Sequence, residues 1–392
     1  MKWLTLLLIA IFIITSNSDY SRQSYLDQAT ERHNFSIFWW EIKNLPNKWL
    51  HLVWEKFPGN KPSDKERTTL IKEYLVTSNK LNNNKQKLTA KEKTKLEKDL
   101  KSLRARTEES IESIISNVLI EEELGISFNI LIPPTDFKLD SPPDIVVTSP
   151  RDKIVFSSSR LISNNLTELE KSEIELLIES NKETSAIVDK LGGLGTYPAF
   201  VSDKGSLRNL LQTASHEWLH NYWILHPIGR HMWDSSEMNI LNETAANIAG
   251  DELGDIAFQS IGGIITEHSS STKSSTEYKF YLNEILKETR LEVDKLLAKK
   301  KIEEAENYMA TVTRNLQSKG YPIRKINQAY FAFHGNYADN PSSTSSIGIE
   351  LKEYRGYFGN IGQFIKSISK IENYTQFIQI LNSKRKVLEP TL

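Results

Sequence analysis

Five residues in the middle of the chain, His216-Glu-Trp-Leu-His220, have types and a spacing that suit metal chemistry. If this stretch is helical, His216 and His220 stand one turn apart on one face, where both imidazoles can bind a single zinc ion. Glu217 lies between them and could take a proton from a water molecule that the metal activates. Glu243 follows 23 positions after His220 and would be a third ligand. The fourth position would stay open, which indicates a zinc hydrolase.

The residues around this motif predict the helix that it needs. Ser206 can cap the start of a helix, and apolar residues recur after it at three- and four-residue spacing. These are Leu207, Leu210, Leu211, Ala214, Trp218, Leu219 and Tyr222. The two histidines then lie in the middle of the helix, where their geometry is fixed. The alternative is a buried helix with two hydrogen-bonded histidines and a surface glutamate.

A second helix is expected to carry Glu243. The residues Asp234-Ser-Ser-Glu237 have the pattern of a capping box, and an apolar stripe follows them. Asn247 stands four residues after Glu243, on the same face. Its amide carbonyl could accept the second ring N–H of a ligating histidine and fix its orientation. The alternative for Glu243 is a solvated helix glutamate.

Together these motifs resemble the gluzincin metallopeptidases, the group of thermolysin-like and membrane-alanyl-aminopeptidase-like enzymes. The stretch from Leu241 to Gly250 is also similar to bacterial exported proteins predicted to be aminopeptidases. The resemblance covers about residues 192–255 and, faintly, 320–340, where Asn327-Gln-Ala329 carries it. It therefore extends over roughly a fifth of the chain.

The resemblance implies a role for each matching residue. It makes His216, His220 and Glu243 the ligands of one zinc ion (Zn2+) per chain, and Glu217 the catalytic base. Asn247 is a departure, because thermolysin-like enzymes carry an aspartate at that position. A neutral amide would make the ligating histidine less basic than a carboxylate would.

Residues 1–18 have the form of an export signal. Lys2 gives a cationic start, an apolar run extends to Thr15, and polar residues follow. The run of about a dozen residues is short for a bilayer span, which needs about 20. A cleaved signal, a retained membrane anchor and a buried core segment all stay open. The first two predict an exported protein of the bacterial periplasm or cell envelope.

The composition limits the kinds of partner and the redox chemistry that the protein can have. The chain has 392 residues, no cysteine and a formal net charge of −1. Without cysteine there is no disulfide and no thiolate metal site, so a zinc ion must take nitrogen and oxygen ligands. An exported protein without cysteine fits a bacterial envelope better than an animal secretion. A net charge near zero gives no electrostatic footprint for nucleic acid.

Two helical segments are expected in the N-terminal part of the chain. Residues 19–58 are rich in Phe and Trp, and residues 49–57 fit one apolar helix face. This face would either pack onto the body of the protein or lie against a membrane. Residues 59–124 predict a helical hairpin with coiled-coil-like pairing, in which Ser63-Asp-Lys-Glu66 and Thr89-Ala-Lys-Glu92 are capping boxes.

Residues 125–260 predict a zincin-like catalytic core. The sequence pattern changes at Gly125. From there on, short apolar runs bounded by prolines follow in place of the charged helical pattern. The expected elements are strands at 126–132, 144–148 and 153–157 and a helix at 167–180.

The stretch from Leu191 to Val201 comes directly before the zinc helix and is rich in glycine. Its second half, Thr-Tyr-Pro-Ala-Phe-Val, suits an edge strand because proline is tolerated there. Such an edge could pair with an extended peptide or protein substrate. The candidate substrate-binding residues are Gly193, Thr196, Tyr197 and Ala199. An ordinary loop and strand is the alternative.

Residues 261–392 are expected to be helical and to close the cleft, with a break near 299–301. A peptidase also needs a donor, beyond the metal, for the oxyanion of the tetrahedral intermediate. Tyr337 is the first candidate and His334 the second, with Tyr330 behind them. Core packing is the alternative for each.

These features predict a mostly helical α+β fold with a small mixed sheet, at about 126–201, beside the zinc helix. The predicted function is that of a zinc metallopeptidase. Glu175 or Glu179 could hold a free N-terminus if it is an aminopeptidase. Another hydrolase, an inactive zincin kept as a binding module and a structural protein working through its hairpin stay open. A purely structural zinc site would need a fourth protein ligand, for which His226 and His231 are nearest.

Overall fold

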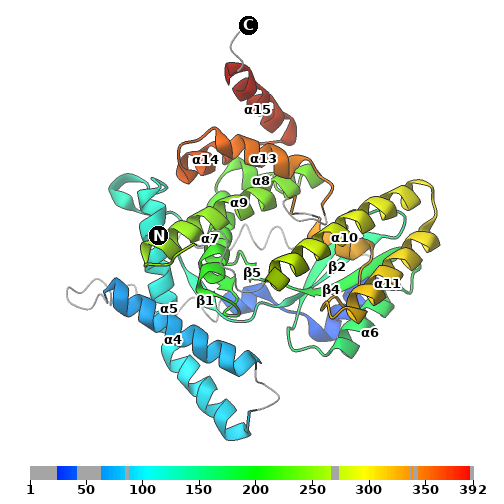
Figure 1. Ribbon diagram of the computed structural model, residues 1–392, viewed down its shortest axis with the longest axis horizontal. Helices are drawn as coiled ribbons and strands as arrows, with labels where there is room; N and C mark the ends of the chain where they lie inside the picture. The colour runs from blue at the N-terminus through cyan, green and yellow to red at the C-terminus, as the bar shows by residue number, and fades with distance from the viewer. Residues whose placement is uncertain are drawn as a thin grey trace.

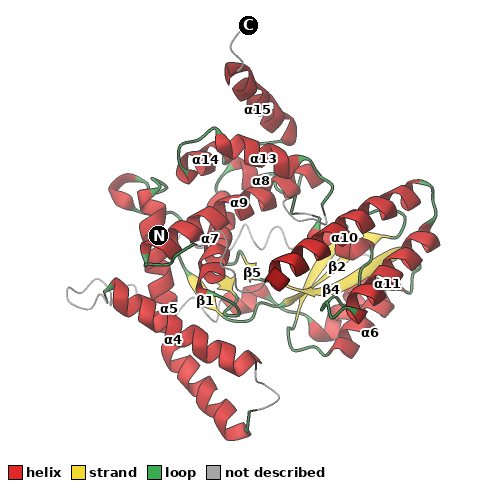
Figure 2. Cartoon of the chain, in the orientation of Figure 1, coloured by secondary structure: helices red, strands yellow, loops and turns green. Residues whose placement is uncertain are grey.

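The computed structural model describes residues 24–41, 63–83, 88–265, 273–335, 337–338 and 343–388. Within these ranges the chain is mostly helical, with two small three-stranded sheets (Figure 1, Figure 2). The expected α+β, mostly helical fold is therefore confirmed. The described helices include none with the length and apolar character that crossing a bilayer requires. The predicted signal at 1–18 and the apolar face at 49–57 lie outside the described residues.

The predicted hairpin consists of α4 (Asp64–Asn83) and α5 (Ala90–Glu121), which extend from the body of the protein (Figure 1). Both predicted capping boxes are present. In the second, the backbone N–H of Thr89 donates to the Glu92 carboxylate at 2.9 Å. These caps satisfy backbone groups that the first turn of each helix leaves unpaired.

Side chains join the hairpin to the body. The hydroxyls of Tyr74 and Ser78 both donate to the buried carboxylate of Asp203 at 3.0 Å. The C-terminal half of α5, from Ile111 to Leu119, buries its apolar side chains in the main core. The hairpin is therefore continuous with the core at one end.

Two closely packed helices, α7 (Leu207–Trp223) and α9 (Ser236–Ser260), form the centre of that core. Their backbones approach because glycines of α9 face α7. A Cβ atom at Gly254 would lie only 2.4 Å from Cα of Gln212, and Gly250 meets the α7 backbone in the same way. Because neither position has room for a larger side chain, this contact fixes how the two helices are aligned.

A mixed sheet lies beside α7, with the strand order β1-β6-β5. Its strands are β1 (Phe137–Leu139), β6 (Ala199–Val201) and β5 (Gly193–Leu194). β6 pairs parallel with β1 and antiparallel with β5. The segment predicted as an edge strand is thus the central strand, and the edge is β5. That prediction was wrong because β1, at three residues, is too short to leave an alternating pattern.

The second sheet is antiparallel, with the order β3-β2-β4. Its strands are β2 (Asp144–Pro150), β3 (Ser158–Ile162) and β4 (Thr184–Lys190). Helix α6 (Glu168–Glu179) packs on one face and α12 (Gln328–His334) packs on the other. The single mixed sheet expected from the sequence is therefore two separate sheets.

The local predictions in this region have mixed outcomes. The strand at 144–148 and the helix at 167–180 are confirmed, the latter with its capping box. The strand expected at 126–132 contains the short 3-10 helix η2 (Ser127–Asn129), because positive φ angles there interrupt an extended chain. The strand expected at 153–157 is the turn between β2 and β3.

The outer edge of β4 is closed by side chains instead of a further strand. The backbone N–H groups of Ala186 and Val188 point away from β2. They donate to the carboxylates of Glu179 at 3.0 Å and Glu175 at 2.6 Å, which both project from α6.

The carbonyl groups of the same edge are satisfied from the segment before α12. The Ala186 oxygen accepts from Lys325 at 3.1 Å and from Asn327 at 2.8 Å. The Val188 oxygen accepts from Arg324 at 2.8 Å. Charged side chains thus occupy the hydrogen-bonding positions of a neighbouring strand, a known protection for exposed sheet edges. We call this arrangement the β4 edge clasp.

The C-terminal region is helical, as expected. α10 (Lys273–Ala298) and α11 (Ile302–Ser318) pack together and are separated at the predicted break. Beyond α12, three further helices pack against α9, namely α13 (Ile347–Gly356), α14 (Ile361–Ile368) and α15 (Tyr374–Leu388).

The described part of the aromatic N-terminal segment packs onto the body. It contains α2 (Tyr25–Thr30) and η1 (Glu31–His33). Further on, the ring of Trp40 stacks on Phe200 of β6, with centroids 3.7 Å apart. Trp40 therefore packs onto the body, whereas Trp39 beside it is 68% exposed.

Candidate metal centre

Helix α7 places both motif histidines on one face, as the sequence predicts. Ser206 caps the helix by accepting the backbone N–H of Asn209 at 3.2 Å, and the apolar side of the helix is buried. The Nε2 atoms of His216 and His220 lie 2.9 Å apart. Two ring nitrogens this close can bind the same ion.

Glu243 completes the set from α9. Its Oε2 atom lies 3.7 Å from Nε2 of His216 and 3.5 Å from Nε2 of His220. A point equidistant from these three atoms is about 2.0 Å from each, which is the distance at which zinc binds imidazole nitrogen and carboxylate oxygen. The three predicted ligands therefore fit a zinc ion as they stand. Glu217 is nearby, since its carboxylate and the two histidine rings have ligand atoms within 4.8 Å of one another.

An amide accompanies each histidine. The Asn247 side chain forms a hydrogen bond with His216, in the place that the sequence predicts. Asn242, which was not predicted, lies beside His220 and contributes to the raised pKa of that ring. Its buried amide nitrogen donates to the Ile228 carbonyl at 3.3 Å, and its Oδ1 atom has no hydrogen-bond partner among the described residues. A neutral amide thus accompanies each ring.

Tyr337 contacts Glu243, the third candidate ligand. Its hydroxyl donates to the Glu243 carboxylate and contributes to the lowered pKa of that group. Tyr337 was predicted as a donor to the oxyanion, and in this structure its hydroxyl contacts a candidate metal ligand.

Burial and the charges of neighbouring residues together set the pKa values of the site. Burial and the neighbouring His220 lower the pKa of His216 to about 4. Burial also disfavours a charge on His220, but Glu243 and Glu217 outweigh it and raise the pKa of His220 to about 9. The pKa of Glu243 is lowered against the effect of burial, chiefly by His220. The two rings together hold one proton that a metal ion would displace.

Glu217 lies under the glycine-rich edge strand. It is 6% exposed, and burial raises the pKa of its carboxyl group to about 8. A Cβ atom at Gly193 of β5 would lie 2.2 Å from its Oε1 atom. Only glycine therefore lets the β5 backbone pass this close to the carboxylate. A group with a pKa near neutrality is suited to taking and returning a proton.

A cavity of about 570 Å³ opens over these residues. Its walls come from β5, α7, α9 and the segment around the end of α12. The C-terminal region therefore closes one side of the cleft, as the sequence predicts. Of the predicted residues, those on its walls are Gly193, His216, Glu217, Asn247, His334 and Tyr337.

His334 is held by a carboxylate that the sequence reading missed. Its Nε2 atom lies 2.9 Å from Oδ2 of Asp189 on β4. Burial alone would raise the pKa of Asp189, but the hydrogen bond and charge of His334 lower it. The ring of Tyr330 packs against His334 at 4.3 Å and is not part of the cavity wall.

Three of the four predicted substrate-binding residues do not line the cavity. The Thr196 hydroxyl donates to the Pro198 carbonyl at 2.7 Å, and the Tyr197 hydroxyl points to the segment before β1. Ala199 is fully buried in the central strand β6. Only Gly193 remains on the wall, because the edge of the sheet is one strand away from the predicted place.

The histidines considered as a fourth ligand are engaged elsewhere. They flank the short helix α8 (Pro227–Arg230). His226 Nδ1 lies 2.9 Å from the Tyr222 carbonyl, and His231 Nδ1 lies 2.7 Å from Asp234. Neither belongs to the group of described residues that could hold a metal. Neither histidine therefore supplies a fourth ligand in this structure.

Glu175 and Glu179, the candidates for binding a free N-terminus, belong to the β4 edge clasp. Glu175 is bound to Arg324, and Glu179 lies 2.8 Å from the Lys325 ammonium group. Neither lines the cavity over the metal site.

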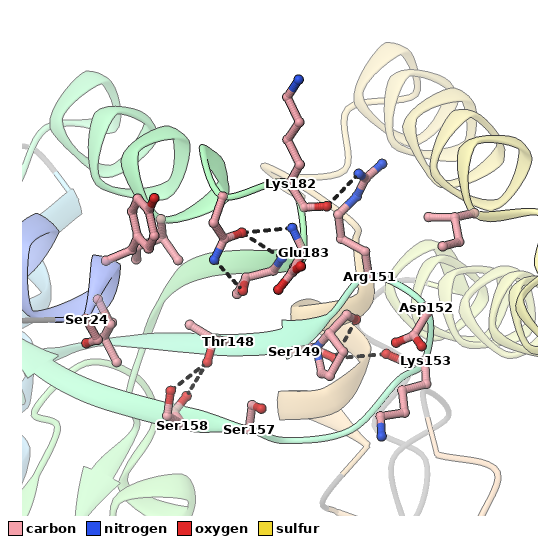
Figure 3. A pocket seen from close by; sticks show the side chains of 17 residues that line it. Ser24, Thr148, Ser149, Arg151, Asp152, Lys153, Ser157, Ser158, Lys182 and Glu183 are labelled. Carbon is pink, nitrogen blue, oxygen red and sulfur yellow. Dashed lines mark hydrogen bonds between the residues drawn. The ribbon is translucent and has the colours of Figure 1, made fainter. Parts of the chain in front are cut away.

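A larger cavity of about 750 Å³ lies between α2, the β2–β3 turn and the segment before β4 (Figure 3). Its polar groups largely satisfy one another, as dashed lines in Figure 3 show for Thr148 with Ser158 and for Arg151 with the Lys182 carbonyl. It contains none of the candidate residues.

Asp189 and Asn242 carry no motif that a single sequence could reveal. Asp189 lies near the end of an unpredicted strand, and Asn242 is adjacent to Glu243 without sharing its face. No family model matches the sequence, and neither curated proteins nor solved structures give a match. Membership of the gluzincin group stays a prediction.

Proposed function

We propose that the protein is a zinc-dependent metallopeptidase that hydrolyses peptide bonds. One observation carries the proposal. The donor atoms of His216, His220 and Glu243 converge on one point at zinc-binding distance, and this point adjoins a cavity that also contains Glu217. A zinc ion bound there would supply the Lewis acid that polarises a substrate carbonyl and makes water more acidic.

Glu217 is the proposed general base. Its carboxylate accepts a proton from the attacking water and returns it to the nitrogen of the leaving amine. Burial raises the pKa of its carboxyl group, which favours uptake of the proton from the water. The close passage of Gly193 restricts how the carboxylate can turn.

The cavity walls suggest how a peptide is held. The main chain of an extended substrate pairs with the β5 edge at Gly193–Leu194, which has no further strand beyond it in the described sheet. On the opposite side, His334 and Tyr337 are the proposed donors to the oxyanion. His334 is oriented for this by Asp189.

The proposed location is the cell envelope. It follows from the sequence pattern of residues 1–18 and from the absence of cysteine. A reporter fused after residue 60 should leave the cytoplasm, and a reporter retained there would contradict export.

The direct test is digestion of a peptide library by the wild type beside Glu217→Gln, read by mass spectrometry. Cleavage by the wild type should fall by about two orders of magnitude or more in the variant, the usual scale of general-base loss. Zinc content and folding should stay unchanged. Equal cleavage would show that Glu217 is not the base. A cellular phenotype that survives in the variant would favour an interaction protein working through the hairpin.

A further inference from the structure

The loop that follows α5 exposes an unusual number of large apolar side chains. Phe128, at its tip, is 96% exposed, and Ile126, Ile130 and Ile132 beside it are each between 43% and 54% exposed. Single exposed apolar residues are ordinary, but a contiguous group in one short loop marks an interaction surface. We call residues 125–132 the Phe128 knob.

The knob is fixed in place at its base. Leu124 and Leu131, which flank its apolar tip, are buried in the main core. Between them the backbone N–H of Ile126 donates to the Ile130 carbonyl at 2.8 Å, which closes the neck of the loop. After the knob, the indole N–H of Trp218 on α7 donates to the Pro133 carbonyl at 3.1 Å. The base of the knob is therefore held on both sides, while its exposed side chains lie outside the core.

The backbone at the tip holds Phe128 outward. Phe128 has φ 64° and ψ 28°, and Asn129 after it has φ 57°. A bulky residue rarely adopts this left-handed conformation, because its Cβ atom then crowds the backbone. Such strain persists where the surrounding structure imposes it and is concentrated at functional sites. A loop that no surrounding contacts constrain would relax out of this conformation.

The chemistry of the knob fits lipid. From Gly125 to Pro134 the sequence has no charged residue. Phe128 at the tip is 96% exposed, so it can enter a fluid phase directly, whereas a protein partner would need a matching pocket. Phe and Ile side chains enter the boundary between lipid headgroups and acyl chains. We propose that the Phe128 knob inserts into the surface of a phospholipid bilayer and holds the folded body of the protein against it.

This contact is separate from the expected N-terminal anchor and from the proposed activity. An anchor of residues 1–18 would hold the chain near a membrane without orienting its body. The knob adds a second point on the folded part, at the end of α5, and two points fix an orientation. The metal site plays no part in it, so the experiment below can fail while peptide cleavage stands.

The absence of cysteine makes the test direct. Ser127→Cys, which keeps every apolar side chain of the knob, is labelled in the full-length protein with an environment-sensitive fluorophore. Glu173→Cys on the exposed side of α6, across the view in Figure 1 from α5, is the matched control. Both proteins are mixed with phosphatidylcholine vesicles, with and without phosphatidylglycerol. A probe entering the bilayer should shift to the blue and brighten at least about twofold.

The label at 127 should respond and the label at 173 should not. Phe128→Ser in the Ser127→Cys background should remove the response or weaken vesicle binding about tenfold to a hundredfold, the effect of exposing one Phe side chain. Leu169→Ser, at another exposed apolar residue, should change nothing. Vesicle-bound protein with a silent label at 127 would overturn the proposal. A response at 127 that depends on protein concentration without vesicles would overturn it too, in favour of self-association.

Discussion

His334 on α12 and Asp189 on β4 lie 145 positions apart in the sequence and 2.9 Å apart in the structure. Their contact joins the helical wall of the cavity to the sheet behind it. The β4 edge clasp joins the two elements a second time, through the segment that precedes α12. The position of His334 beside the candidate metal site therefore depends on β4, which contributes none of the candidate ligands.

The purified protein should contain close to one zinc ion per chain. His216→Ala, His220→Ala and Glu243→Ala should each lose most of it, because two remaining ligands bind weakly. Metal analysis after dialysis measures this. His226→Ala is the matched control and should keep its zinc, since that ring bonds to a backbone carbonyl. Full retention in all three ligand variants would refute the assignment.

Zinc affinity should rise with pH up to about 8 to 9. The proton shared by the two histidine rings must leave before zinc binds, and the raised pKa of His220, about 9, keeps it bound at pH 7. Each unit of pH below that value should weaken the apparent affinity about tenfold for each proton released. Competition with a chelator between pH 6 and 9 gives the slope. An affinity that does not change over this range would contradict the coupled pair.

Asp189→Asn should lower kcat with little change in KM. The variant lacks the carboxylate that orients the His334 ring, and the proposed contact of that ring with the oxyanion is made mainly in the transition state. A loss of about tenfold or more is expected, the scale seen for partners that orient catalytic groups. Tyr337→Phe should behave alike. Asp152→Asn, on the exposed β2–β3 turn, is the control. Unchanged kcat in both variants would show that neither His334 nor Tyr337 donates to the oxyanion.

Asn247→Asp should tighten zinc binding, and Asn247→Ala should weaken it, by about tenfold in each direction. A carboxylate makes the hydrogen-bonded His216 a stronger ligand, whereas removal of the amide leaves the ring without its orienting partner. Zinc competition assays on both variants test this. The same affinity in the aspartate and alanine variants would show that this contact does not tune the metal.

Gly254→Ala should destabilise the protein by about 1–3 kcal/mol, the usual cost of inserting a methyl group into a packed contact. Its Cβ atom would meet Cα of Gln212 at 2.4 Å and push α9 away from α7. Because the two helices carry the proposed metal ligands, zinc affinity should fall as well. Gly356→Ala, where a Cβ atom meets nothing within 4 Å, is the control for urea unfolding. Equal midpoints would contradict the steric argument.

Sequence periodicity predicted the helices well, and most capping patterns did so too. The capping box expected at Asp234–Glu237 was wrong, because Ser235 caps α9 by accepting the backbone N–H of Met238 at 3.2 Å. Thr89 with Glu92 and Thr167 with Glu170 mark true helix starts, because a capping box is read from four adjacent residues. His216 and His220 follow from helical spacing alone.

Local sequence patterns could not predict the strands, or the site residues other than the candidate ligands. β1 is three residues long, and its parallel pairing with β6 links residues 62 positions apart, such as Phe137 and Ala199. Sequence order therefore gave no means of knowing that Ala199 is central and Gly193 is at the edge. The pairing of Asp189 with His334 is likewise a product of tertiary packing, which no local pattern encodes.

The β4 edge clasp also determines which fragments of the chain should be soluble. A fragment that stops before Tyr321 would lack Arg324, Lys325 and Asn327, and the carbonyl groups of β4 would be open to any strand nearby. Copies of such a fragment could then pair edge to edge and precipitate. Solubility on expression of the sheet therefore depends on residues far beyond it in the sequence.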